Sequence, residues 1–399
     1  MLTYLLDWTE LLLRWLHLIA GVAWIGASFY FVMLDCSLRP PARERDRERG
    51  VFGELWAVHG GGIYRSEKFL AGPQDQALPE RLHWSKWEAY TTWLSGFSLL
   101  VLIYWIGAEA WLIDPARMAW TAPQAVAASA LVLAGGWLVY DLLCRLLGGR
   151  DGLLALLMLL LVAAASWGLF QIFAARAAAL HLGAMLGTLM AANVFFHIIP
   201  GQKKMLAEIR AGLTPNPQYG RVGKQRSVHN TYFTLPVLLV MIGNHYPMLW
   251  SHEQGWLSLL LLALAGVLIR QFFVLRHSGR ALWRLPLLAL LLIAAVMVWL
   301  RPAAPAAGLP AVSMGEARRI LDARCVACHS AAPTQPGFAQ PPKDLRLESD
   351  ALARQHAPGI AQTVASGYMP LGNLTGMNDD ERARLLAWAR AAQKGGESP

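Results

Sequence analysis

The sequence predicts an all-α protein: a polytopic membrane domain of about eight transmembrane helices, followed by a small extracytoplasmic domain. Three observations support this fold class. Hydrophobic residues make up 55% of the 399 residues and charged residues only 15%, which departs from the composition of soluble chains. Apolar stretches long enough to cross a bilayer recur throughout residues 1–301. After a Pro/Ala-rich linker at 302–310, residues 311–399 contain the motif Cys325-Val326-Ala327-Cys328-His329.

Eight segments of about twenty apolar residues are candidate membrane spans. They lie near residues 9–34, 87–110, 124–147, 153–174, 178–199, 231–250, 255–275 and 284–300. The loops after the first, third, fifth and seventh spans are rich in Lys and Arg, whereas the alternate loops hold few, with Arg117 and Arg176 as exceptions. By the positive-inside rule the basic loops face the cytoplasm. We therefore expect a multi-pass protein of the bacterial inner membrane whose termini and tail are periplasmic.

The charge balance and the remaining cysteines fit this topology. The net charge of +9 lies in the basic loops, where orientation and anionic lipid account for it, so the predicted partner is the lipid bilayer and not nucleic acid. Cys36 and Cys144 fall at cytoplasmic helix ends and are expected to be reduced structural residues. The first span is too long for a signal peptide and no cleavage site follows it, so we expect it to stay in the membrane.

The motif at Cys325 to His329 is the signature of covalent c-type haem attachment. Two thiols with two residues between them reach the two vinyl groups of one porphyrin, and the adjacent imidazole binds the iron. A redox or zinc pair is the alternative, but no second Cys pair lies nearby. The topology places this motif on the oxidising side of the membrane, where such attachment takes place. Residues 311–399 are therefore predicted to form a class I-type cytochrome c domain.

The sixth ligand of this haem is predicted to be Met369, which precedes Pro370 forty residues after His329. Helices are expected from Gly315 to Arg324 and from Arg382 to Ala392, the second capped by Asn378. A thioether ligand raises the reduction potential and makes the haem an electron acceptor. The alternative ligands in the tail are Met377, Met314 and His356.

Ionisable residues inside membrane spans are candidates for function because they are costly to bury in lipid. His17 lies in the first span near Gly21 and Gly26, where the missing side chains leave room for a porphyrin or for a neighbouring helix. His181 and His245 fall toward the same, outer side. One hypothesis is that these three histidines hold a second, b-type haem or form a relay. Helix packing around a hydrogen-bonded histidine explains His17 equally well.

A denser set of polar and aromatic residues falls at or near the inner side, in the segments 59–68, 83–90 and 225–232. Three consecutive glycines after His59 allow close approach of a planar ligand, tryptophan rings stack on such a ligand, and Arg or Lys neutralises an anion. Each signal is weak by itself. Tryptophan at a helix end is more often an interfacial anchor, and Arg226 alone is explained by the positive-inside bias.

At these segments the chain resembles the bacterial membrane-bound urate hydroxylases, also called cytochrome c-type urate oxidases. The resemblance covers essentially the full length and is carried by the runs 58–68, 83–97, 217–236, 244–247 and 324–329. It implies conversion of urate to 5-hydroxyisourate in purine breakdown. It also implies that electrons leave through cytochrome c to a downstream respiratory acceptor and do not produce hydrogen peroxide.

The chemistry of urate suggests which residues bind it. Urate is a planar anion, so its site needs a cation and a stacking surface. We predict anion binding by Arg226 and Lys68, amide contacts from Asn230, and stacking on Trp84 or Trp87.

Urate must also lose a proton before it releases electrons easily, so the site needs a base. We predict His229 or His59 in this role, with Glu88 behind it. A rival site lies on the outer side near Asn244, His245 and Trp250, closer to the predicted haem c.

Two other classes of protein were weighed. The membrane domain could be a non-catalytic electron-transfer subunit that passes electrons from quinol or a b-type haem to haem c, since the His17 segment resembles the first helix of membrane haem proteins of the protoporphyrinogen oxidase type. Such a carrier has no use for anion-binding segments. A copper or respiratory-assembly factor requires Met, His or Cys ligand pairs on the outer face, and the sequence has no convincing set there.

Overall fold

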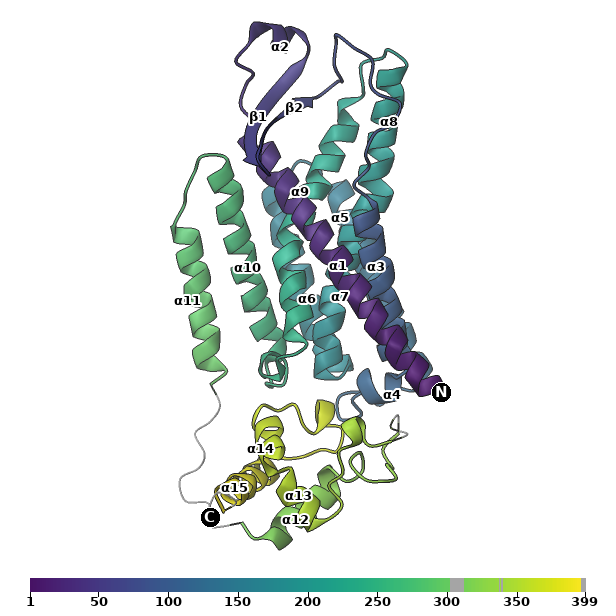
Figure 1. Cartoon of the computed structure of the whole chain (residues 1–399), viewed down its shortest axis with the longest axis vertical. Helices are drawn as coiled ribbons and strands as arrows, with labels where there is room; N and C mark the ends of the chain where they lie inside the picture. The colour runs from purple at the N-terminus through teal and green to yellow at the C-terminus, as the bar shows by residue number, and fades with distance from the viewer. Residues whose placement is uncertain (302–311, 337, 339, 396–399) are drawn as a thin grey trace. The chain divides into compact units, whose positions relative to one another are not determined.

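The computed structural model describes residues 1–301, 312–336, 338 and 340–395 (Figure 1). The predicted linker at 302–310 lies outside the described residues. The contacts within the chain divide it into two compact units. Unit 1 comprises Met1–Leu99, Ala184–Leu238 and Ala263–Leu292, and unit 2 comprises Leu100–Gly183, Leu239–Leu262 and Ile293–Pro399. Several long helices pass from one unit into the other.

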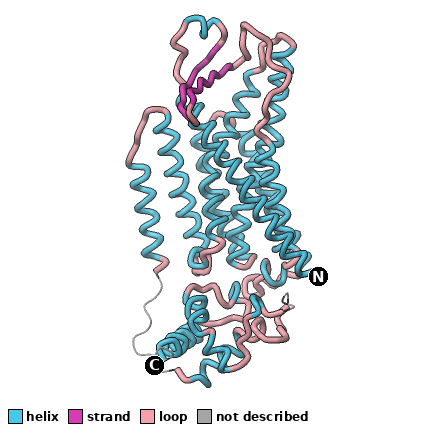
Figure 2. Tube along the Cα trace, viewed as in Figure 1, coloured by secondary structure: helices cyan, strands magenta, loops and turns pink. Residues whose placement is uncertain are grey.

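Helices dominate the part of the chain before the linker (Figure 2). The long ones are α1 (Leu2–Ser37), α3 (Trp87–Leu100), α5 (Ala122–Leu146), α6 (Asp151–Ile172), α7 (Ala175–Ala192), α8 (Ile199–Arg210), α9 (Pro217–Gly243), α10 (Gly255–His277) and α11 (Arg284–Trp299). Shorter elements are α4 (Ala108–Trp111), the π-helical segments η1 (Val101–Trp105) and η2 (Asn193–Ile198), and the 3₁₀ turn η3 (Pro247–Leu249).

Each of the eight predicted spans falls on helical structure, but not all eight meet the length and hydropathy expected of a span. Five helices do so, and they cover Tyr4–Ser37, Ala122–Leu146, Asp151–Ile172, Ala175–Arg210 and Gly255–His277. Arg284–Trp299 is a shorter apolar helix. These apolar helices are compatible with a membrane protein.

The segment before the sixth predicted span differs from the sequence prediction. The sixth span was predicted to begin near residue 231, after the polar residues from 225 onward, but α9 runs without interruption from Pro217 to Gly243. Proline is favoured in the first turn of a helix, and the Gln, Arg and Lys residues that follow it favour helix. Arg226 and Asn230 therefore lie on one helix, one turn apart.

The prediction of an all-α fold is wrong in one region, because unit 1 contains a β-hairpin (Figure 2). Strand β1 (Val51–His59) pairs antiparallel with β2 (Gly62–Phe69), and the short helix α2 (Glu44–Glu48) precedes them. Gly60 and Gly61 have φ values of 58° and 80° and form the two-residue turn that such a hairpin requires. The glycine run was interpreted as a ligand-approach loop, but its first two residues make this turn.

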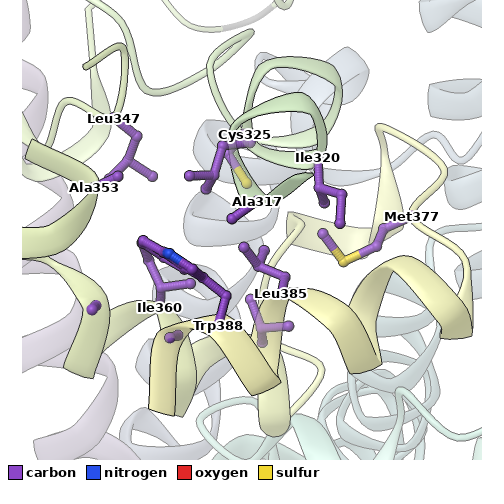
Figure 3. Packing of buried hydrophobic residues seen from close by; sticks show 13 residues of the cluster. Ala317, Ile320, Cys325, Leu347, Ala353, Ile360, Met377, Leu385 and Trp388 are labelled. Atoms are coloured by element: carbon purple, nitrogen blue, oxygen red, sulfur yellow. The ribbon is translucent and has the colours of Figure 1, made fainter. Parts of the chain in front are cut away.

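Residues 312–395 contain α12 (Met314–Arg324), η4 (Pro342–Asp344), α13 (Asp350–Gln355), α14 (Ala357–Ala365), η5 (Leu371–Asn373) and α15 (Asp379–Gly395). The two helices predicted in this tail are confirmed. Ser313 and Glu316 form a capping box at the start of α12, and Asn378 accepts a hydrogen bond from the Glu381 backbone at the start of α15. Figure 3 shows the apolar core of the tail, which includes Leu321, Cys325 and Trp388.

Candidate functional site

A buried polar cluster lies in unit 1 where α9 meets the end of α7 and the start of η2. Arg226 is 2% exposed, Asn230 7% and Asn193 0%. The Arg226 Nη1 atom lies 3.5 Å from Asn193 Oδ1. Asn193 Nδ2 donates to Asn230 Oδ1 at 2.8 Å, and Asn230 Nδ2 donates to the Met190 carbonyl at 3.0 Å. A guanidinium and two amides are thus held together inside an apolar unit.

Helical spacing explains this arrangement. Arg226 and Asn230 are four residues apart, which places them on the same face of α9. Thr234 continues that face one turn further and is also fully buried. The partner Asn193 opens a π-helical turn, a distortion that is frequent at functional sites. Two elements distant in the sequence therefore supply polar atoms to one place.

Asn193 was not among the predicted site residues. It belongs to an apolar run that was treated as a membrane span, and one uncharged amide changes the hydropathy of such a run little. The sequence did hold one indication of a role for Asn193. A polar side chain inside a membrane span is costly to bury and requires a partner. Burying the Arg226 charge is more costly still unless it is paired and hydrogen-bonded.

The structure places Trp84 close to this region. It packs against the small apolar cluster of Ala89, Val194 and Ile199, of which Val194 follows Asn193 directly in η2. His229 is half-buried. As the residue before Asn230 on α9, it leaves the helix about 100° around the axis from Asn230. Three of the predicted site residues, Arg226, Asn230 and Trp84, therefore lie in the same part of unit 1, around Asn193 and Val194.

Four other predicted residues lie apart from the cluster or in different surroundings. His59 is exposed at the hairpin tip, and Trp87 is 65% exposed with the Lys86 ammonium 5.5 Å from its ring. Glu88 is half-buried in the first turn of α3. Lys68 on β2 forms an ion pair with Asp35 of α1, which Lys224 also approaches at 3.4 Å. Lys68 therefore already has a carboxylate partner.

Of the two ring nitrogens of His17 in unit 1, Nδ1 has hydrogen-bond partners among the described residues. Its Nδ1 atom lies 2.9 Å from the Thr92 carbonyl and 3.2 Å from the Ser95 hydroxyl of α3. A carbonyl can only accept, so Nδ1 carries the proton and Nε2 keeps its lone pair. No hydrogen bond ties Nε2 to any residue that the structure describes. A Cβ atom at Gly96 would lie 2.7 Å from the His17 ring, so this close contact requires glycine.

His181 in unit 2 has the opposite arrangement. Its ring is 0% exposed, with Nδ1 2.8 Å from the Ala177 carbonyl and Nε2 2.7 Å from the Ser129 hydroxyl. Trp105 of η1 donates to the same hydroxyl at 2.8 Å, so Ser129 in turn donates to His181. Tyr104 and Phe173 pack against the imidazole. Both ring nitrogens of His181 are engaged.

The rival outer site also lies in unit 2. Asn244 accepts a hydrogen bond of 2.8 Å from Arg176 Nε, and this guanidinium lies 5.0 Å from the ring centroid of Trp111. His245 is exposed, whereas Trp250 is 2% exposed and donates to the Gly243 carbonyl at 3.3 Å. At this site the Arg176 guanidinium lies over the Trp111 ring and donates to the Asn244 amide oxygen.

The residues predicted to bind haem c gather at the end of α12. Cys325 is buried, Cys328 is half-buried, and burial raises the pKa of the Cys325 thiol to about 12. His329 Nδ1 donates to the Leu345 carbonyl at 3.0 Å, and burial lowers the pKa of this histidine. Its Nε2 atom is therefore the nitrogen available to iron. A structural zinc site needs four ligands, and the described residues form no group of three or more His, Cys, Asp or Glu suited to a metal.

The candidate sixth ligands differ in their surroundings. Met369 is half-buried in a loop, and its backbone carbonyl accepts a hydrogen bond of 3.0 Å from Arg382 Nη1. Met377 is 4% exposed and belongs to the apolar core, where Figure 3 shows it beside Ile320 and Leu385. Met314 packs against the same core. Met369 is the methionine that the core does not enclose.

Comparison with known families identifies the larger part of the chain. A family model described as the N-terminal domain of urate oxidase matches residues 3–301. Because this match covers well over half of the chain, the protein belongs to the urate oxidase N-terminal family. No curated protein and no solved structure gives a significant match. The match ends at the residue before the predicted linker.

Proposed function

We propose that this protein is a membrane-bound oxidoreductase that converts urate to 5-hydroxyisourate and passes the electrons to a c-type haem on its own tail. The family supports urate as the substrate. The reaction adds one water to urate and releases two protons and two electrons. It therefore requires a site for the anion, a group that accepts a proton, and an electron acceptor.

The observation that carries the proposal is the buried Arg226 with Asn193 and Asn230. In a low-dielectric environment a guanidinium attracts an anion more strongly than in water, and its planar donors suit a planar ligand. The two amides present both donors and acceptors, which match the N–H and C=O groups of a purine ring. Trp84, packed beside η2, supplies an aromatic surface. Arg226 binds the anion and the amides orient it.

Proton removal is assigned to His229 because, of the two predicted bases, it lies on α9 three residues after Arg226, whereas His59 is at an exposed hairpin turn. A neutral imidazole can accept a proton from urate. Glu88 and Lys68 keep supporting roles in this proposal: Glu88 as an acidic group near the start of α3, and Lys68 as a cation restrained by Asp35.

The tail residues fit a covalent haem. Cys325 and Cys328 would form the thioether bonds, His329 would bind iron through Nε2, and Met369 would be a second protein ligand of the iron. The hydrogen bond from His329 Nδ1 to the Leu345 carbonyl fixes the tautomer and the ring orientation that iron binding requires. Such a haem accepts one electron at a time.

A b-type haem on the outer-side histidines is a further part of the proposal. Of the three predicted histidines, we assign His17 as its ligand. His181 uses both nitrogens within the protein, and His245 is exposed. His17 has Nδ1 fixed by Thr92 and Ser95 and keeps the Nε2 lone pair. Replacing His17 with Ala should remove any b-type pyridine haemochrome signal, and His245→Ala should not. One haem per chain, all of it c-type, would exclude this site.

The remaining features of the proposal concern location and partners. We place the protein in the bacterial inner membrane with both termini and the haem tail in the periplasm, because the basic loops alternate with nearly uncharged ones. A soluble cytochrome or terminal oxidase of the respiratory chain then accepts the electrons. Nucleic acid is not a partner in this proposal.

The second candidate function is a non-catalytic electron-transfer subunit that passes electrons from quinol to haem. The His17 environment favours it. The Arg226 cluster favours the enzyme, because a carrier of electrons gains nothing from a buried cation beside the Asn193 and Asn230 amides.

The test is anaerobic reduction of the purified, oxidised protein by urate, followed at the cytochrome α-band. The urate enzyme predicts reduction at a catalytic rate, with 5-hydroxyisourate formed at one molecule per two electrons. The carrier predicts rapid reduction by a quinol and none by urate. Pyridine haemochrome spectra of the same sample count the haems of each type.

A further inference from the structure

The β1–β2 hairpin displays large apolar side chains at its tip. Trp56 is 59% exposed, Val58 80%, Ile63 73% and Tyr64 55%. Val58 pairs with Ile63 across the strands, one pair before the turn, so the two form a single apolar patch. Side chains of this size, gathered and exposed, indicate a surface that contacts something apolar.

The other end of the hairpin is held by charged residues. The guanidinium of Arg65 contacts the carboxylates of Asp46 and Glu54, with Nε 2.7 Å from Glu54. Glu67 lies 3.2 Å from the same guanidinium, and Asp46 and Glu54 are both buried. The hairpin is therefore polar and tied down near α2, and apolar at its free tip.

The direction of the hairpin follows from its contact with the end of α1. After α1 ends at Ser37, Arg39 forms an antiparallel bridge with Glu54. A Cβ atom at Gly53 would lie 3.0 Å from Leu38 Cβ, so β1 runs directly beside this segment. Because the pairing is antiparallel, β1 proceeds from Glu54 back along the direction from which α1 came. The tip points toward α1 and not away from it.

The distance can be estimated from strand geometry. Five residues separate Glu54 from His59, which corresponds to about 17 Å of strand. The same length along α1 is about 11 residues, so a strand parallel to α1 would reach roughly the level of Ser28. Figure 1 shows the hairpin beside the C-terminal end of α1. Tyr30 and Phe31, near this level on α1, are 48% and 54% exposed.

We propose that this hairpin is an interfacial anchor, with Trp56, Val58, Ile63 and Tyr64 inserted into the headgroup region of the bilayer on the side where α1 ends. The proposal rests on the membrane location proposed above. The tip of the hairpin is apolar, and the apolar stretch of α1, to which the hairpin is tied by the Lys68–Asp35 ion pair, is only 6% buried. Trp and Tyr favour the membrane interface.

The anchor assigns a role to Lys68. Through its ion pair with Asp35, Lys68 fastens β2 to α1, and Lys224 brings α9 to the same carboxylate. Insertion of the tip would therefore fix the cytoplasmic end of α1 relative to α9, the helix that carries Arg226.

The test measures the depth of nitroxide labels in the full chain, in nanodiscs of zwitterionic and anionic lipid. Val58→Cys and Ile63→Cys are labelled in a background with Cys36→Ser and Cys144→Ala. The matched control is Phe52→Cys, an exposed apolar position of β1 at the opposite end, 56% exposed. We expect the ratio of oxygen to nickel-chelate collisions to be several-fold higher at 58 and 63 than at 52. Equal ratios at all three positions would overturn the proposal.

A fourth label separates this result from the membrane location itself. Leu18 lies in the middle of α1 and is 64% exposed, so a label at Leu18→Cys is oxygen-rich whenever α1 spans the bilayer. An oxygen-rich label at 18 with nickel-accessible labels at 58 and 63 rejects the anchor alone. Nickel-accessible labels at all positions reject the membrane location as well. None of these readings depends on urate turnover.

Discussion

Two buried polar groups of this molecule differ in whether they contain a formal charge. The His181 network of unit 2 is closed: Trp105 donates to Ser129, Ser129 to His181, and His181 to the Ala177 carbonyl. It contains no formal charge. The Arg226 cluster of unit 1 is built around a guanidinium that is 2% exposed. Both groups adjoin a π-helical segment, η1 in the first case and η2 in the second.

The difference teaches how to separate structural from functional polarity in an apolar domain. A neutral chain of donors and acceptors stabilises helix packing and needs no further partner. A buried cation is costly even when it is paired and hydrogen-bonded. A protein that keeps the Arg226 guanidinium buried beside the Asn193 amide retains it at a cost, and a function in anion binding is consistent with that.

The strongest test of this contrast is Arg226→Gln. We expect the rate of haem reduction by urate to fall about 100-fold or more, the size of effect seen when a charge-stabilising donor is removed from an active site. Haem content should stay normal. The matched control is Arg221→Gln, an exposed arginine on the same helix that bonds to Gln218. An equal loss of rate in both variants would show that the buried Arg226 matters no more for the reaction than the exposed Arg221.

The next largest effect is expected at Asn193. Replacement with Ala removes the amide that bridges Arg226 and Asn230, so the guanidinium is less well oriented. We expect the KM for urate to rise about 10-fold, or about 1.4 kcal/mol, with kcat nearly unchanged. Thr188→Ala on α7 serves as the control. A fall in kcat at constant KM would show that Asn193 acts on the reaction and not on binding.

A smaller effect, on stability alone, is expected at Ser129. Ser129→Ala removes the hydroxyl that joins Trp105 to His181, which should cost about 1 kcal/mol, the usual value for hydrogen bonds between membrane helices. The thermal midpoint in detergent should fall while urate turnover at low temperature stays unchanged. Ser98→Ala, which removes only a bond to the Leu94 carbonyl of its own helix, is the control. Loss of turnover in Ser129→Ala would make the His181 network functional too.

The sequence predicted the regular elements better than the site. Apolar runs about twenty residues long specify helices because burial and backbone hydrogen bonding act together there. The hairpin was missed because residues 51–58 show no regular alternation of apolar and polar residues, and its turn glycines also suit a ligand loop. Arg226 and Asn230 were predicted from residue type. Asn193 was missed because only tertiary packing brings it to them, and a single sequence does not record that contact.

The smallest predicted effect concerns an ion pair in the tail. This pair is partly exposed, unlike the buried Arg226 cluster and the buried His181 network. Arg324 Nε lies 3.0 and 3.1 Å from the two carboxylate oxygens of Glu381 and links the end of α12 to the start of α15. The hydrogen bond from Arg324 holds the pKa of Glu381 below its usual value. Because the folded pKa is the lower one, this stabilisation is complete above the unfolded pKa of about 4.3 and is lost as the pH falls through the folded value.

The midpoint of thermal unfolding of the tail, followed by the absorption of the proposed haem, should therefore drop more steeply below about pH 4.3 in the native protein than in Arg324→Gln. The partly exposed pair is weakened by solvent, so the difference should be modest. The control is Arg384→Gln, which pairs with Asp380 on the surface of α15 and, at 3.6 Å, with Glu316 of α12. Both partners are more exposed than Glu381, so this variant should alter the pH profile less. Parallel profiles in all three proteins would mean that Arg324 contributes through its contacts with the Thr375 segment and not through charge. Charge would then matter for function where it is buried, at Arg226, and little where water screens it.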